Sequence, residues 1–194
     1  MKEDLIKLLK ELEQIDAEER VKGLPTKVRM RNITPDVGLY LYIMVKATKA
    51  KRILEIGTSN GYSTIWLGQA AKENNATVTT LEYDQRKINL AKENIAKAGL
   101  PDTITILEGD AKETISKLEG EFDFIFIDAE KEDYIIYFDL VFPILKVGGV
   151  IIADNVVSHN DILKKYVDYV RANPNTQSCL IPIGRGEELT LKIR

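Results

Sequence analysis

From Arg52 onward, short apolar runs alternate regularly with amphipathic segments of helical length. The strand candidates are Arg52–Ile56, Thr77–Leu81, Thr103–Leu107, Phe122–Ile127 and Val150–Ala153. The helix candidates between them are Tyr62–Lys72, Gln85–Ala98, Lys112–Leu118 and Tyr134–Leu145, and the helix stops are Gly99-Leu100-Pro101 and Gly148-Gly149. Strands that alternate with helices of this length predict parallel β-α-β units, with helices on both faces of one sheet.

The last part of the chain predicts a reversal of strand direction. After a helix over about Ile162–Arg171, two strand candidates, Thr176–Pro182 and Glu188–Ile193, flank a short turn that contains Gly184 and Gly186. Two strands joined by so short a turn are antiparallel. The fold prediction is therefore an α/β, Rossmann-like domain. Its seven-stranded sheet is mostly parallel, with one antiparallel edge strand and helices on both faces.

The first 22 residues predict an amphipathic helix, because apolar side chains recur there at helical spacing among Lys and Glu. These side chains are Leu5, Leu8, Leu9, Leu12 and Ile15. The apolar stripe packs either on the chain's own domain or against a second copy, and both readings stay open. A chain of 194 residues is long enough for one domain with a single core, so we expect one domain over residues 1–194.

The charge and composition exclude several classes of function. A net charge of -3 and a pI near 5.4 give no general basic surface for nucleic acid. No apolar run approaches the ~20 residues that a membrane span requires. The N-terminus is charged from Lys2 onward and lacks the apolar segment of a signal peptide. We therefore expect a cytoplasmic protein, in which the single cysteine, Cys179, packs in the core.

Two strand candidates end abruptly in an acidic residue. Asp128 follows one of them, and Asp154 and Asn155 follow the other. Ligands bind outside the carboxyl ends of the strands in an open parallel sheet, so these side chains are expected to gather at one site. Two carboxylates and an amide oxygen suit Mg²⁺ or Ca²⁺ better than zinc.

A glycine-containing turn joins the first strand candidate to the first helix candidate. Gly57 permits a sharp turn, and Gly61 lets the backbone approach a ligand closely. Ser59 stands where the dinucleotide fingerprint has its middle glycine, so a pyrophosphate is a poor fit. Glu82 follows the second strand candidate, where an acidic side chain accepts hydrogen bonds from ribose hydroxyls.

Two further acidic residues extend this pattern. Glu55, at the end of the first strand candidate, could receive an amino group through the turn, and Asp110, after the third, would lie beside an adenine. S-adenosylmethionine (SAM) matches these features, because it carries adenine, ribose and a charged amino acid but no phosphate.

Several motifs together resemble the cation-dependent O-methyltransferases of the catechol and caffeoyl-CoA type, which are class I SAM-dependent methyltransferases. They are Thr34–Gly38, Glu55–Gly57, Gly61–Ser63, Asp128–Tyr134, Val147–Ile151 and Asp154-Asn155. The resemblance implies a divalent cation held by Asp128, Asp154 and Asn155, with Mg²⁺ foremost and Mn²⁺ or Ca²⁺ as alternatives. It also implies that Asp128 and Lys131 are catalytic, since Lys131 matches the family's catalytic lysine. SAM would lie along Gly57, Ser59, Ser63, Glu82, Ala111 and Asp128, with Ile33 and Thr34 closing over it.

The activity implied by the resemblance is methyl transfer from SAM to a small molecule with two adjacent hydroxyls, such as a catechol, by a homodimeric enzyme. Two alternatives stay open: a hydroxylated uridine in tRNA as the acceptor, and a SAM-binding scaffold without turnover. The chain departs from the family at Val156–Asn160, where plant enzymes have a tryptophan-containing loop, and at Gly184-Arg185-Gly186, where the family often has Gly-Asp-Gly. The acceptor, the binding of coenzyme A esters and the participation of His159 stay open.

Overall fold

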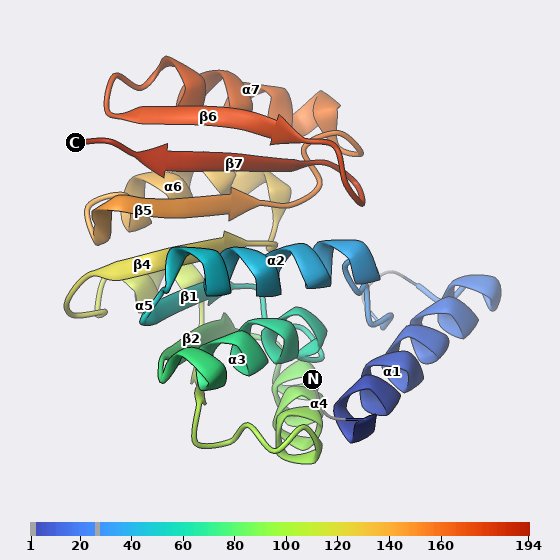
Figure 1. The fold of residues 1–194 in the computed structure, drawn as a ribbon. Helices are drawn as coiled ribbons and strands as arrows, with labels where there is room; N and C mark the ends of the chain where they lie inside the picture. The colour runs from blue at the N-terminus through green and yellow to red at the C-terminus, as the bar shows by residue number, and fades with distance from the viewer. Residues whose placement is uncertain (1–2, 26–27) are drawn as a thin grey trace.

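The structure, a computed structural model, describes residues 3–25 and 28–194. Its described residues contain one seven-stranded sheet in the order β3-β2-β1-β4-β5-β7-β6 (Figure 1). The strands are β1 (Arg52–Ile56), β2 (Thr77–Glu82), β3 (Ile104–Glu108), β4 (Phe122–Ile127), β5 (Leu145–Ala153), β6 (Thr176–Ile181) and β7 (Glu187–Lys192). Strands β1 to β5 pair in parallel, and β7 runs antiparallel to β5 and β6. The predicted mostly parallel sheet with a reversed strand at one edge is confirmed; the reversed strand is β7, one place in from β6.

Helices cover both faces of this sheet (Figure 1). They are α1 (Glu3–Val21), α2 (Pro35–Thr48), α3 (Tyr62–Asn74), α4 (Gln85–Lys97), α5 (Ala111–Ile115), α6 (Tyr134–Val141) and α7 (Asn160–Ala172), with a 3₁₀ turn, η1, at Lys131–Asp133. Apolar residues of α1 to α4 share one core cluster, and those of α5 to α7 share the other. Within the described residues, no helix has both the length and the apolar composition needed to cross a bilayer.

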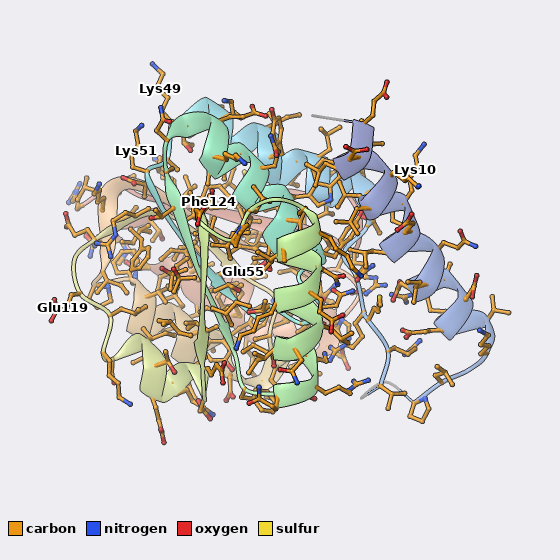
Figure 2. All side chains as sticks on the ribbon, turned by 90° about the horizontal axis from the view of Figure 1, so that it is seen from below. Lys10, Lys49, Lys51, Glu55, Glu119 and Phe124 are labelled. Atoms are coloured by element: carbon orange, nitrogen blue, oxygen red, sulfur yellow. The ribbon has the colours of Figure 1, made fainter. Side chains whose placement is uncertain are left out.

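The central strand β4 separates the two clusters. Phe124 and Phe126 face the first cluster, and Ile125 and Ile127 face the second. Because both faces of a parallel strand are covered, β4 is almost continuously apolar. Figure 2 shows Phe124 in the interior, whereas Lys10 and Glu119 lie at the periphery. The first polar side chain after the strand, Asp128, therefore emerges at its carboxyl end.

Helix α2 was not among the predicted elements. Its sequence is apolar almost throughout, which hides the helical period from a reading based on alternation. A start signal is nevertheless present, because Thr34 precedes Pro35 at the first helical position. Its buried residues include Val37, Leu41 and Val45, which recur every four residues.

The predicted helix Tyr134–Leu145 is too long. Helix α6 ends at Val141, shortly before Pro143, which has no backbone N–H to continue a helix. Strand β5 already begins at Leu145, so Gly148-Gly149 lies inside a strand and does not end a helix. The pairing of β4 with β5 shifts register between Phe122 and Phe124, which marks an irregularity at these glycines.

The prediction that Cys179 packs in the core is wrong. Cys179 lies on the edge strand β6 and is exposed. A strand-like apolar pattern does not distinguish an edge strand from a central one, and only the strand order reveals the difference. For the N-terminal stripe, Leu5, Leu8, Leu9 and Leu12 pack into the chain's own core, while Ile15 is 41% exposed.

Candidate functional site

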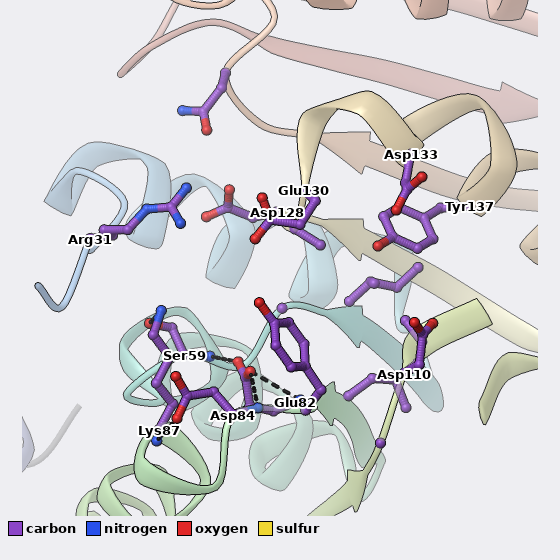
Figure 3. A pocket seen from close by; sticks show the side chains of 18 of the residues that line it. Arg31, Ser59, Glu82, Asp84, Lys87, Asp110, Asp128, Glu130, Asp133 and Tyr137 are labelled. Carbon is purple, nitrogen blue, oxygen red and sulfur yellow. Dashed lines mark hydrogen bonds between the residues drawn. The ribbon is translucent and has the colours of Figure 1, made fainter. Parts of the chain in front are cut away.

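A cavity of about 740 Å³ opens at the carboxyl ends of β1 to β4 (Figure 3). Its wall contains seven of the predicted site residues, namely Gly57, Ser59, Glu82, Asp110, Ala111, Asp128 and Asn155. The other predicted residues lie behind or beside this wall; they are Ile33, Thr34, Glu55, Gly61, Ser63, Lys131 and Asp154. The site is therefore built from a cavity-facing layer and a supporting layer.

The turn after β1 approaches the neighbouring strand very closely. Gly57 has a φ of 104°, and a Cβ at this position would lie 2.2 Å from the carbonyl oxygen of Asp128. The Gly57 amide donates a 3.1 Å hydrogen bond to the Leu81 carbonyl. Gly61, with a φ of 87°, leads into α3. The glycines therefore fit the backbone of this turn between two strands, which is a steric requirement.

Glu82 is held rigidly at the end of β2 by backbone donors. Its carboxylate accepts hydrogen bonds from the amides of Ser59 at 2.8 Å and of Tyr83 and Asp84 at 3.0 Å each (Figure 3). An ionised carboxylate has about four acceptor positions, so capacity remains for a ligand hydroxyl. The same contact ties the glycine turn to β2, because Ser59 belongs to that turn.

Glu55 and Ser63 support the turn from within the protein. The Glu55 carboxylate is fully buried and accepts hydrogen bonds from the hydroxyls of Ser63, Thr64 and Thr80. Burial raises the pKa of Glu55 from 4.5 to about 7, although the three hydroxyls act in the opposite direction. Glu55 therefore lies behind the cavity wall, in contact with α3 and β2, and not on the wall itself.

The predicted metal ligands lie side by side at the ends of adjacent strands. The Asp128 amide donates to the Ile56 carbonyl at 2.9 Å, and the Asp154 amide donates to the Ile127 carbonyl at 3.0 Å. Asp154 and Asn155 are buried, and the side-chain nitrogen Nδ2 of Asn155 has no hydrogen-bond partner. Burial, followed by repulsion from Asp128, raises the pKa of Asp154 from 3.8 to about 6.

Lys131 joins this group from the 3₁₀ turn that follows β4. Its ammonium donates to the Asp128 carboxylate at 2.7 Å and to the Tyr134 hydroxyl at 2.9 Å. Only 6% of Lys131 is exposed, so it is not an ordinary surface lysine. The Tyr134 hydroxyl is in turn close to the carbonyls of Ile127 and Asp154. Tyr134, which is not among the predicted site residues, thus positions the lysine.

Glu187 is a further acidic residue of the site that is not among the predicted residues. It is fully buried at the start of β7, within hydrogen-bond reach of the Asp154 carboxyl, and neither of its oxygens has another donor among the described residues. Burial and repulsion from Asp154 raise the pKa of Glu187 to about 12. The predicted strand begins only at Glu188, which leaves Glu187 outside it. The register, which pairs Ala153 with Glu188, would have placed it beside Asp154.

The described residues contain no group of three or more His, Cys, Asp or Glu side chains placed to hold a metal. A cation at Asp128 and Asp154 therefore depends on the amide oxygen of Asn155 as a third ligand. His159 lies at the start of α7, with its Nδ1 2.9 Å from the Ser158 hydroxyl, and it is not part of the cavity wall. Three cationic residues that were not predicted as site residues do line the cavity, namely Arg31, Lys87 and Arg185.

Comparison with known proteins finds similarity to O-methyltransferases. A family model described as O-methyltransferase matches residues 3–193. A catechol O-methyltransferase of Niastella koreensis is 38% identical over 136 residues, which is 68% of this chain and 61% of that protein. A caffeoyl-CoA O-methyltransferase of Eucalyptus gunnii is 30% identical over 209 residues, which is 96% of this chain and 81% of that protein.

Solved structures agree with this comparison. The O-methyltransferase from Bacillus cereus, in complex with SAH, has a TM-score of 0.81 and 29% identity, over 96% of this chain and 90% of that chain. The chain spans about three fifths of the length of the bacterial catechol O-methyltransferases that it matches.

Proposed function

Because the chain belongs to the O-methyltransferase family, we propose that it transfers a methyl group from SAM to a hydroxyl of a small molecule, with the help of a divalent cation. The acceptor carries two adjacent hydroxyls, as a catechol does. The observation that carries the proposal is the convergence of Asp128, Asp154 and Asn155 at adjacent strand ends, with Lys131 bonded to Asp128. A homodimer in solution belongs to the same proposal.

SAM supplies the methyl group, and the cavity wall offers groups that suit its parts. The Glu82 carboxylate, fixed by three backbone amides, is placed to accept hydrogen bonds from the ribose hydroxyls. Gly57 and Ser59 allow close contact with the backbone of the turn. Asp110 and Ala111 form the opposite part of the wall, where adenine is expected. The relative from Bacillus cereus that was solved with SAH supports SAM as the cofactor.

The acidic pair at the strand ends suits a divalent cation. Burial of Asp154 next to Asp128 brings two carboxyl groups together, and a cation would offset the repulsion between them. The oxygens of Asp128, Asp154 and Asn155 form a hard ligand set, and Mg²⁺ favours such ligands. When bound, the cation would lower the pKa of two chelated hydroxyl oxygens and fix their orientation.

Lys131 is the residue proposed to accept the proton of the reacting hydroxyl at its Nζ atom. Asp128 and Tyr134 hold this nitrogen in place from two sides, so the lysine is oriented before the acceptor binds. A deprotonated hydroxyl is the stronger nucleophile for in-line attack on the methyl group.

The test is methyl transfer from labelled SAM to catechol, with Mg²⁺ and then with excess EDTA. We expect transfer with Mg²⁺ and its loss on chelation, with recovery when Mg²⁺ is restored. Transfer that persists in EDTA would contradict the role of the cation. SAM binding without transfer to catechol, but with transfer to tRNA or with no transfer at all, would favour one of the two alternatives.

A further inference from the structure

The short turn between β6 and β7 carries an arginine, Arg185, on the cavity wall. The backbone of this turn is fixed from two sides. The Gly184 amide donates to the Asp36 carboxylate of α2 at 3.2 Å. On the other side, the amides of Val157 and Ser158 donate to the Arg185 carbonyl at 3.1 Å each. Arg185 is therefore held by a turn that is tied directly to the segment after Asn155.

The guanidinium of Arg185 has no hydrogen bond or ion pair to another residue in the described part of the chain. The side chain is half-buried. Two other charged groups of the wall are paired, Asp128 with Lys131 and Asp133 with Lys112, whereas Arg31 also has no ion pair among the described residues. An arginine that is held by its backbone at a cavity and lacks a partner is positioned for an anion supplied by a ligand.

A second arginine on the wall, Arg31, lies at a different part of the cavity. Its amide donates to the buried Asp16 at 2.9 Å, which fixes the segment between α1 and α2. Arg31 acts electrostatically on Tyr83 and Lys87, which follow β2, and its side chain points into the cavity toward Asp128 and Glu130 (Figure 3). Tyr83 and Lys87 lie near Glu82, at the end of the cavity assigned to the cofactor. Arg185, beside Asn155, is at the end where the acceptor hydroxyls would bind.

We propose that the acceptor is a dihydroxy aromatic acid, whose carboxylate binds Arg185. This inference rests on the proposed function, because it places the two hydroxyls at Asp128, Asp154 and Asn155. A guanidinium matches the planar, two-oxygen geometry of a carboxylate and can bind it with two parallel hydrogen bonds. A neutral catechol would leave the arginine without a partner, next to the positive charges of a cation and a sulfonium. Arg185 thus selects the acceptor and takes no part in proton transfer.

The experiment compares 3,4-dihydroxybenzoate with its methyl ester, which has the same hydroxyls but no charge. Both are measured with SAM and Mg²⁺ in the wild type and in Arg185→Gln. We expect the wild type to prefer the acid by about tenfold or more in kcat/KM, since a charge-assisted hydrogen bond contributes on this scale. Arg185→Gln should raise KM for the acid by about the same factor and leave the ester unchanged. Arg185→Lys keeps the positive charge but cannot form two parallel hydrogen bonds to a carboxylate, so it should recover part of the preference for the acid.

The matched control is Arg52→Gln, at the opposite end of β1 from the cavity, which should leave the ratio of acid to ester unchanged. Equal turnover of acid and ester by the wild type would overturn the inference and leave the proposed O-methylation intact. An equal loss for both acceptors in Arg185→Gln, with unchanged thermal stability, would overturn it as well. No methylation of either compound by the wild type would contradict the proposed function, and the inference would fall with it.

Discussion

The ammonium of Lys131 lies 2.7 Å from the carboxylate of Asp128, and both side chains belong to one short stretch that leaves the end of β4. This pair is unlike the exposed ion pairs of the chain, because Lys131 is buried and has a second fixed partner in Tyr134. A buried lysine that is held next to an acidic strand end is costly unless it has a role or is well paired. The pair connects the lysine proposed as the base directly to a proposed ligand of the cation.

Replacement of Lys131 by Met should abolish most of the methyl transfer. A positioned base contributes roughly 10²–10⁴-fold to a rate, and Met keeps most of the side-chain volume. SAM binding, measured by calorimetry, should change little, because Lys131 is not among the wall residues proposed to contact SAM. Lys146→Met is the matched control, since Lys146 also forms a 2.7 Å ion pair, with Asp123, but lies at the start of β5, at the end of the sheet opposite the cavity. A rate in Lys131→Met within about threefold of the control would rule out the base role.

Replacement of Asp154 by Asn should weaken the binding of Mg²⁺. The change removes one negative charge from the cluster and keeps the shape of the side chain. We expect an affinity about tenfold or more lower, measured by calorimetric titration of the metal-free protein. Asp123→Asn provides the comparison, because Asp123 is an acidic residue on the same sheet whose partners are Lys51, Arg52 and Lys146. Equal Mg²⁺ affinities in the two variants would contradict the proposed ligand set.

The sequence predicts the acidic strand ends well but not what surrounds them. Asp128, Asp154 and Asn155 were placed correctly, because a polar residue after a buried strand must emerge at the edge of the sheet. Glu187 and Arg185 reach the same region from β7 and the turn before it, through a register that depends on antiparallel pairing with β5. Such long-range pairing leaves no local signal. The exposure of Cys179 on β6 was missed for the same reason.

Helix α2 shows a different limit of the sequence prediction. Its start signal, Thr34 followed by Pro35, was read only as part of a family motif. The buried spacing of Val37, Leu41 and Val45 is visible in the sequence, but apolar residues on other faces, such as Leu39 and Ile43, obscure it. Leu39 is 46% exposed and Ile43 is 51% exposed. A helix that is apolar on several faces cannot be assigned from periodicity alone.

The burial of Glu55 predicts a pH dependence of stability. Its pKa is raised from 4.5 to about 7, so the folded protein binds this proton more tightly than the unfolded chain. The free energy of unfolding should therefore fall as the pH rises from about 4.5 to 7. The loss of unfolding free energy from Glu55 over this pH range is on the order of 3 kcal/mol, since each pKa unit corresponds to about 1.4 kcal/mol. Denaturant titrations at several pH values in EDTA would measure this slope.

The variant Glu55→Gln separates the effect of Glu55 on the pH dependence of stability from the effects of other groups whose pKa is also raised by folding. Glutamine keeps the volume and cannot ionise, so the slope of stability against pH should become smaller. Part of the slope should remain, because the pKa of Asp154 is also raised, to about 6. Glu121→Gln, at an exposed glutamate, should leave the slope unchanged. A slope in Glu55→Gln identical to that of the wild type would show that Glu55 is already ionised in the folded protein.

Replacement of Gly57 by Ala should damage both folding and cofactor binding. The φ of 104° is unfavourable for alanine, and the new Cβ would lie 2.2 Å from the Asp128 carbonyl oxygen, so β1 and β4 must separate at their carboxyl ends. Gly99→Ala isolates the effect of backbone strain from that of the steric clash. Gly99 also has a positive φ, 67°, but nothing lies within 4 Å of its Cβ position. We expect Gly99→Ala to lose roughly 1–2 kcal/mol of stability through backbone strain. Gly57→Ala should lose clearly more, and calorimetry should show weaker SAM binding in that variant alone. Equal losses of stability, with SAM binding intact in both variants, would mean that the turn can move away from Asp128 without disturbing the site.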